Sequence, residues 1–182
     1  LSTDKACAPI NLYGATKLCS DKLFVSANNI VGKQNLSFSV VRYGNVFGSR
    51  GSVYNVFKNY KDKGFFPITD YKMTRFNITL DYATSMIQDV LKIAKGGEIF
   101  VPKIKSLRVI DLAKAVNNKN KLKIIGVRPG EKIHEQMISS SDSYTTVSLK
   151  NYYAILPAGN KNLIKKFIAK NRCKKVDDNF EY

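Results

Sequence analysis

Residues 1–17, LSTDKACAPINLYGATK, decide how the rest of the chain is interpreted. Tyr13 and Lys17 stand four residues apart, which places them on one face of a helix, one turn from each other. An ammonium group near a phenol favours the phenolate, which can take a proton from a hydroxyl group while hydride leaves the carbon. A bare Y-x-x-x-K match is usually a solvated surface pair. Here the preceding Ser-Thr-Asp-Lys, a polar strand end followed by a loop, favours the chemical interpretation.

The composition describes a folded, basic chain. It has 182 residues, of which 44% are hydrophobic, so it can bury a real core. The formal net charge is +16, but the lysines are scattered and do not interleave with aromatic residues. We therefore expect a solvated surface and no nucleic-acid partner, with some of the charge attracting a pyrophosphate substrate.

Membrane and metal functions find no support in the sequence. No apolar run is long enough to cross a bilayer, so we expect no membrane partner. Cys7, Cys19 and Cys173 form no C-x-x-C pair, which favours reduced thiols in the cytoplasm and predicts no metal site. The only histidine, His134, begins an H-E-x-x sequence, but Ile138 stands where a zinc motif needs its second histidine.

Helical and extended patterns alternate along the chain. A helix from Tyr13 to about Val31 carries an apolar stripe, and the strand predicted over Leu36–Tyr43 completes the βαβ unit of a parallel sheet. A polar turn is expected over Ser139–Ser143. Further helices are predicted at 53–61, 81–95, 107–116 and 160–170, with extended segments at 75–80, 98–101, 122–127 and 144–156.

Two further motifs follow predicted strands. Residues 42–52, RYGNVFGSRGS, form a glycine-punctuated loop at the carboxyl end of a strand, the edge at which ligands bind in open α/β sheets. Its spacing fits neither a dinucleotide fingerprint nor a P-loop. Residues 128–135, RPGEKIHE, predict a strand-to-turn junction, and a surface turn with ion pairs also explains them.

Together these motifs resemble the extended short-chain dehydrogenase/reductases. The match is strongest to the inverting UDP-N-acetylglucosamine 4,6-dehydratases, which act in pseudaminic-acid-type surface glycan synthesis and flagellin glycosylation. By this resemblance the chain is a C-terminal fragment that lacks the glycine-rich NADP loop and is inactive alone. The resemblance implies an α/β fold: the later part of a Rossmann-type doubly wound parallel sheet with a smaller, interleaved α/β substrate-binding region. Residues 1–52 would form the last part of the NAD(P)-binding domain and carry the active site. Residues 53–182 would be mainly the substrate-binding region, interleaved with the sheet domain.

The resemblance also implies residue roles. Catalysis would use Thr3, Asp4, Lys5, Tyr13 and Lys17. NADP, or alternatively NAD, would be bound by Tyr13, Lys17, Val46, Phe47, Gly48, Ser49 and Arg50. UDP-N-acetylglucosamine would be bound by Lys5, Asn45, Val53, Arg128 and Glu131. In ordinary hexose 4,6-dehydratases an Asp-Glu pair stands where this chain has Asp4-Lys5, so Lys5 would be the base that acts on C5. The full-length protein is expected to be a homo-oligomer.

Two alternatives remain open. One is a different sugar-nucleotide enzyme, a 4-epimerase or a retaining 4,6-dehydratase. Asp4-Lys5 argues against the epimerase, because C4 epimerisation requires no acid and base for C5 and C6. The other alternative is a basic RNA- or glycan-binding module, against which the scattered charge argues.

Overall fold

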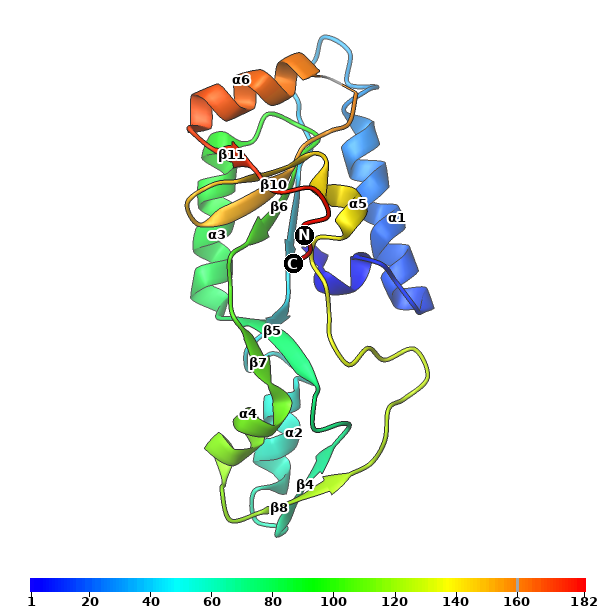
Figure 1. Ribbon diagram of the computed structural model, residues 1–182, viewed down its shortest axis with the longest axis vertical. Helices are drawn as coiled ribbons and strands as arrows, with labels where there is room; N and C mark the ends of the chain where they lie inside the picture. Colours follow the sequence, from blue (N-terminus) through cyan, green and yellow to red (C-terminus); the bar gives the residue numbers. More distant parts are fainter. Residues whose placement is uncertain (160) are drawn as a thin grey trace. The chain divides into compact units, whose positions relative to one another are not determined.

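The computed structural model describes residues 1–159 and 161–182, without the side chain of Lys161. The chain forms two compact units, each built from separate segments (Figure 1). Unit 1 comprises Leu1–Tyr43, Thr84–Lys103 and Gln136–Tyr182. Unit 2 comprises Gly44–Ala83 and Ile104–Glu135. The two units are therefore interleaved in the sequence.

Unit 1 contains a six-stranded sheet whose first three strands are parallel. In the order β1-β2-β6-β10-β9-β11, Ser2 lies opposite Arg42 and Val40 opposite Ile99. The last three strands are antiparallel, because the predicted extended segment 144–156 folds back as two strands. The α/β prediction is thus confirmed. The strands are β1 (Ser2–Thr3), β2 (Val40–Tyr43), β6 (Ile99–Pro102), β9 (Thr146–Ser148), β10 (Tyr152–Ile155) and β11 (Lys174–Lys175).

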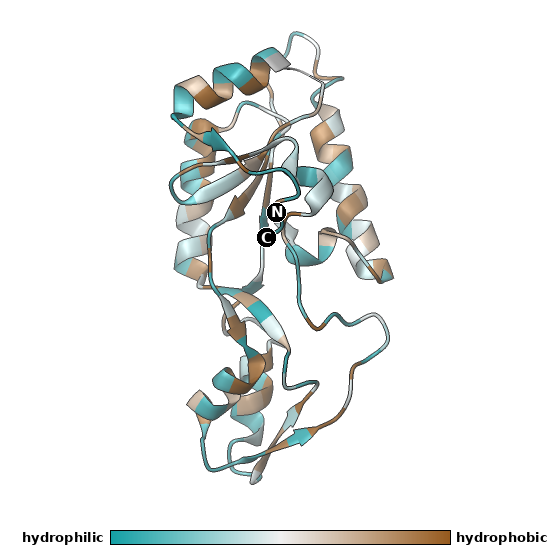
Figure 2. Cartoon of the chain, viewed as in Figure 1, coloured by the Kyte–Doolittle hydropathy of each residue, from teal (hydrophilic) through white to brown (hydrophobic). Residues whose placement is uncertain are grey.

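Helices cover this sheet and complete its core. Met86 of α3 and Phe167 of α6 pack with Val41, Phe100 and Val147 of the strands. The hydrophobic colouring of β6 in Figure 2 fits its position inside the sheet. The helical elements are the short 3-10 turn η1 (Asp4–Ala6), α1 (Leu12–Ala27), α3 (Leu80–Ile93, which begins in unit 2), α5 (Ser140–Ser143) and α6 (Lys161–Asn171).

The first helix differs from its prediction in length and in orientation. It ends at Ala27, where the side chain of Asn28 caps the helix. The Asn28 side-chain nitrogen Nδ2 donates to the Val25 carbonyl of the last turn and to the Phe38 carbonyl before β2, at 2.9 Å each. Leu23 of the predicted apolar stripe is 71% exposed and Phe24 is 51% exposed. The stripe is therefore not the packed face of α1 in this chain. The buried positions of the helix are Gly14 and Asp21, so α1 packs through small and polar residues.

Unit 2 has two small sheets and two amphipathic helices. Phe57 of α2, Phe66 and Ile68 of β4, and Val109 and Ala113 of α4 form its core. One sheet has the order β3-β5-β7, and the other pairs β4 with β8. The bounds are α2 (Val53–Tyr60), α4 (Val109–Val116), β3 (Asn45–Val46), β4 (Phe65–Ile68), β5 (Thr74–Ile78), β7 (Ser106–Arg108) and β8 (Lys121–Ile124).

Several predicted boundaries move for local reasons. Residues 106–108 pair with β5, so the helix predicted from Leu107 begins at Val109. The predicted polar turn over Ser139–Ser143 contains a helical turn, because Ser139 and Asp142 form a reciprocal capping box. Asn160, the predicted start of the last helix, lies outside the described residues. Within the described part of the chain, no helix is long and apolar enough to span a membrane.

Candidate active site

Thr3, Asp4 and Lys5 form one hydrogen-bonded group at the end of β1. The Thr3 hydroxyl donates to Asp4 Oδ1 at 2.8 Å, and Lys5 Nζ donates to the same oxygen at 3.0 Å. Asp4 is fully buried, while the Lys5 side chain is 31% exposed. Asp4 Oδ2 is buried and has no hydrogen-bond partner in the described part of the chain. A buried carboxylate oxygen without a partner is costly, and a catalytic role or a bound ligand is one explanation for such an atom.

A glycine lets α1 pack directly against this group. A Cβ atom on Gly14 would lie 2.5 Å from the Lys5 carbonyl oxygen and 2.9 Å from Pro9 Cβ, so any larger residue would push the helix away. The Asn11 side chain caps the same turn by accepting from the Gly14 amide at 2.8 Å. The first turn of α1, which carries Tyr13, is therefore held against the backbone of the Asp4-Lys5 turn.

Tyr13 and Lys17 occupy the first two turns of α1, as the sequence predicts. Tyr13 is 54% exposed, and Lys17 is half-buried. The Tyr13 carbonyl accepts from the Thr16 hydroxyl at 2.8 Å, which stabilises the helix at this point. The phenol thus lies on the surface of unit 1, where a ligand can reach it, while the acid and amine of the neighbouring turn are more enclosed.

Residues 44–52 of the glycine-punctuated loop lie in unit 2, where hydrogen bonds to the loop backbone hold them. The Phe47 amide donates to the Ile78 carbonyl at 2.8 Å, and the Asn55 side chain of α2 donates to the Ser49 carbonyl at 2.8 Å. Gly48 has a φ of +74°, which favours glycine. The residues predicted to line the cofactor from Phe47 to Arg50 are all exposed, and Val46 and Asn45 are half-buried. Val53 instead packs against the hydrophobic core of unit 2.

The RPGE turn of unit 2 forms an ion pair with a buried arginine of β5, a partner that the sequence pattern did not identify. The Glu131 carboxylate lies 3.5 Å from the Arg75 guanidinium and also accepts from the Arg128 amide at 3.4 Å. Arg75 is buried and donates to the carbonyls of Thr74 and Ile133 at 2.7 and 3.1 Å. The Arg128 side chain is exposed. The only available signal for Arg75 was a charged residue inside the apolar strand pattern of β5.

A second unpredicted ion pair anchors the helix that carries Tyr13. Arg42 of β2 lies 3.0 Å from Asp21 of α1, and both side chains are 3% exposed. Arg42 also donates to the Met137 carbonyl at 2.8 Å. Because Asp21 is one turn after Lys17, this contact fixes the part of α1 next to the candidate catalytic residues. No local pattern pointed to this pair, because its partners lie 21 residues apart on a helix and a strand.

The fold is that of the Rossmann-type α/β proteins. A solved structure described as Pen from Bacillus thuringiensis is similar to this chain, with a TM-score of 0.85 and 34% sequence identity. The match covers 100% of this chain and 55% of the Bacillus chain. A dTDP-glucose 4,6-dehydratase from Streptomyces venezuelae, with NAD and TYD bound, shares the fold with a TM-score of 0.62 at 18% identity, over 94% of this chain and 59% of its own.

Sequence comparison gives the family. Residues 1–157 match the family described as polysaccharide biosynthesis protein, and the chain belongs to that family. It is 56% identical to a UDP-N-acetylglucosamine 4,6-dehydratase (inverting) of Campylobacter jejuni over 160 residues, 87% of this chain and 48% of the relative. It is 39% identical to a UDP-glucose 4-epimerase of Rickettsia bellii, over 85% of this chain and 47% of the relative. The chain spans about half the length of these curated relatives.

Proposed function

We propose that this chain supplies the acid/base half of an inverting UDP-N-acetylglucosamine 4,6-dehydratase. The observation that carries the proposal is the Thr3-Asp4-Lys5 group, in which a buried carboxylate oxygen without a partner lies beside an amine. Its support is the 56% identity to an enzyme of that name. The product would be a UDP-2-acetamido-2,6-dideoxy-4-keto-hexose with C5 inverted, used in pseudaminic-acid-type glycans.

The reaction requires a nicotinamide cofactor, and residues of this chain fit one. Tyr13 is accessible, Lys17 lies one turn further along α1, and the glycine loop of residues 46–50 exposes backbone and polar groups. In the proposal Tyr13, Lys17 and this loop hold NADP. The cofactor supplies reversible acceptance of hydride from C4 of the sugar. Lys17 would support Tyr13 from one helical turn away and hold the nicotinamide ribose, and Tyr13 would take the O4 proton, with the Thr3 hydroxyl bonded to O4.

Asp4 and Lys5 serve the elimination of water. One proton transfer along their 3.0 Å contact converts the ion pair into a neutral acid and a neutral amine. The Lys5 amine then takes the C5 proton, which the adjacent C4 ketone makes acidic, and protonated Asp4 gives a proton to the departing C6 hydroxyl. Return of the C4 hydride to C6, with delivery to the opposite face of C5 of the proton that Tyr13 took from O4, directly or through water, would complete the inversion. No net oxidation occurs.

The substrate contacts of the proposal lie mainly in unit 2. The exposed Arg128 guanidinium would bind the UDP phosphates through paired hydrogen bonds, with Asn45 at the sugar. Glu131 would act indirectly, because its carboxylate is shared between Arg75 and the Arg128 backbone and so shapes the turn. Val53 would support the substrate loop from the core.

The test uses the complete protein in a single turnover with UDP-N-acetylglucosamine in deuterated water. For Lys5→Ala we expect reduced nicotinamide still to form, because Tyr13 and Lys17 are intact. Deuterium incorporation at C5 should fall by at least about a hundredfold, the usual contribution of a general base. Lys22→Ala, an exposed lysine of α1, is the matched control and should behave as wild type.

The outcomes separate the proposal from its rivals. Wild-type exchange in Lys5→Ala would assign the C5 base elsewhere. Formation of a C4 epimer without loss of water by the wild-type protein would favour the 4-epimerase, the activity in the name of the Rickettsia relative. No turnover of any UDP-sugar by the wild-type protein would reject the enzyme assignment.

A further inference from the structure

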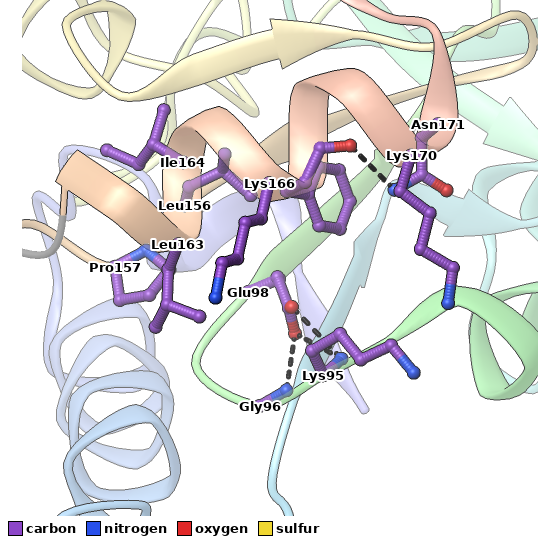
Figure 3. A pocket seen from close by; sticks show the side chains of 11 residues that line it. Lys95, Gly96, Glu98, Leu156, Pro157, Leu163, Ile164, Lys166, Lys170 and Asn171 are labelled. Carbon is purple, nitrogen blue, oxygen red and sulfur yellow. Dashed lines mark hydrogen bonds between the residues drawn. The ribbon is translucent and has the colours of Figure 1, made fainter.

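A pocket on unit 1 lies apart from every residue of the candidate active site. Its volume is about 260 Å³, and it lies between α6, the turn from α3 into β6, and the end of β10 (Figure 3). Leu156 and Phe167, both nearly fully buried, contribute to its lining. The family match ends at residue 157, so α6 contributes a wall that lies beyond the matched segment.

The turn opposite α6 is fixed by two glycines. Gly96 and Gly97 have φ values of +111° and +88°, which other residues rarely adopt. A Cβ atom on Gly97 would lie 3.1 Å from the Pro157 ring, and one on Gly96 would lie 2.5 Å from Asn28 Oδ1. Pro157, which lines the pocket, therefore packs closely against Gly97 in this turn.

Among the described residues, Glu98 is the one carboxylate that lines the pocket, and its oxygens already accept hydrogen bonds. Glu98 is 2% exposed and accepts from the amides of Lys95 and Gly96, at 3.0 and 2.9 Å, and from the Ser39 hydroxyl at 2.7 Å. Figure 3 shows its carboxylate turned to the Lys95–Gly96 backbone. These bonds stabilise the turn and give the Glu98 oxygens hydrogen-bond partners, and because three lysines stand against this one carboxylate, the described lining keeps a net positive charge.

The rim of the pocket is basic. Lys95, Lys166 and Lys170 line it, and Figure 3 shows the two α6 lysines extending from the helix toward the opposite turn. In the part of the chain that the structure describes, none of their ammonium groups forms an ion pair. The Asn171 amide is engaged with the Phe167 carbonyl at 2.9 Å. An apolar hollow is thus surrounded by positive charge.

From this combination we propose that the pocket binds an amphipathic anion, a small apolar body with one carboxylate or phosphate group. An apolar cavity of about 150 Å³ holds benzene, so about 260 Å³ holds a phenyl ring or a short acyl chain. The apolar part lies on Phe167 and Leu156, and the anionic group lies among the lysines. The pocket contains none of the proposed catalytic or substrate residues, so this inference is independent of the dehydratase proposal.

The experiment titrates the protein with octanoate and with octan-1-ol, which has the same chain length and no charge. Binding is measured by calorimetry and by amide chemical shifts. We expect octanoate to bind at least about tenfold more tightly, with shifts at Gly96, Leu163 and Asn171 and weaker binding at high salt. Equal binding of both probes, or no shifts at these residues at millimolar octanoate, would overturn the proposal.

Matched charge variants test the rim. Lys166→Gln/Lys170→Gln should weaken octanoate about fivefold or more, since each exposed charge contact contributes modestly. Lys165→Gln/Lys174→Gln removes the same charge from exposed positions that do not line the pocket, and it should bind like wild type. If both double variants bind octanoate equally weakly, the effect comes from the net charge of the protein, and the proposed site is rejected.

A final experiment distinguishes binding of a free anion from binding of a membrane lipid. Vesicles of phosphatidylcholine with phosphatidylglycerol present the same chemistry within a membrane. Shifts at the pocket with octanoate and not with vesicles support a soluble ligand. Vesicle binding without octanoate binding would contradict the proposal and assign this face to a membrane surface.

Discussion

Two buried aspartates of unit 1 are paired in different ways. Asp21 meets Arg42, and both side chains are 3% exposed. Asp4 meets Lys5, whose side chain is 31% exposed, and it leaves one oxygen without a partner in the described part of the chain. The first pair joins a helix to a strand and to the Met137 backbone. The second pair joins only neighbours in the sequence, and so contributes little to holding the fold together.

The difference between the pairs indicates that they have different roles. A fully enclosed ion pair is costly to break because the remaining charge stays buried. A pair with one partner near water can separate, exchange a proton and re-form. The Asp21–Arg42 contact therefore holds α1 in place, and the Asp4–Lys5 contact is the one to which we assign the proposed proton transfers.

Arg42→Met should show the largest effect on stability. It leaves the Asp21 carboxylate buried without its partner, so the free energy of unfolding should fall by about 3–5 kcal/mol. Urea denaturation followed by circular dichroism measures this. Asp21→Leu/Arg42→Met removes both charges and should regain most of the loss. A double variant no more stable than the single one would mean that packing of the arginine stem, rather than charge, carries the effect.

Asp4→Asn should change stability far less. Water can solvate the partly exposed Lys5, and the variant no longer buries a charge, so the free energy of unfolding should stay within about 1 kcal/mol of wild type. In the complete protein the same variant should still form reduced nicotinamide but should release water slowly. A stability loss as large as that of Arg42→Met would end the distinction between the two pairs.

The sequence predicted the fold class because its strongest signals are local. The βαβ start and the helices near residues 53–60, 80–93 and 161–171 follow from apolar spacing. The antiparallel addition of β10 beside β6 depends on residues about fifty positions apart, which no local pattern encodes. The prediction that the apolar stripe of α1 is its packed face was wrong for a similar reason. Apolar spacing identifies one face of a helix but does not show which other part of the protein covers that face.

The candidate site was predictable in part. The motif placed Thr3, Asp4, Lys5 and Tyr13 together because only residues 7–11 separate η1 from the first turn of α1. Arg75 was missed, since its contact with Glu131 crosses from a strand to a turn 56 residues later. The roles of the glycine loop, Arg128 and the cofactor contacts rest on resemblance and stay predictions.

The position of β10 has a consequence for synthesis on the ribosome. It pairs with β6 on one side and with β9 on the other, yet roughly 50 residues separate the end of β6 from its start. At a synthesis rate of about 5–20 residues per second, the edge of β6 stays unpaired for about 3–10 s before β10 has been made. An open strand rich in Ile, Phe and Val is a template for wrong pairing during that time. We therefore expect the yield of folded protein to depend on translation speed between residues 103 and 151 and on chaperones that shield this edge.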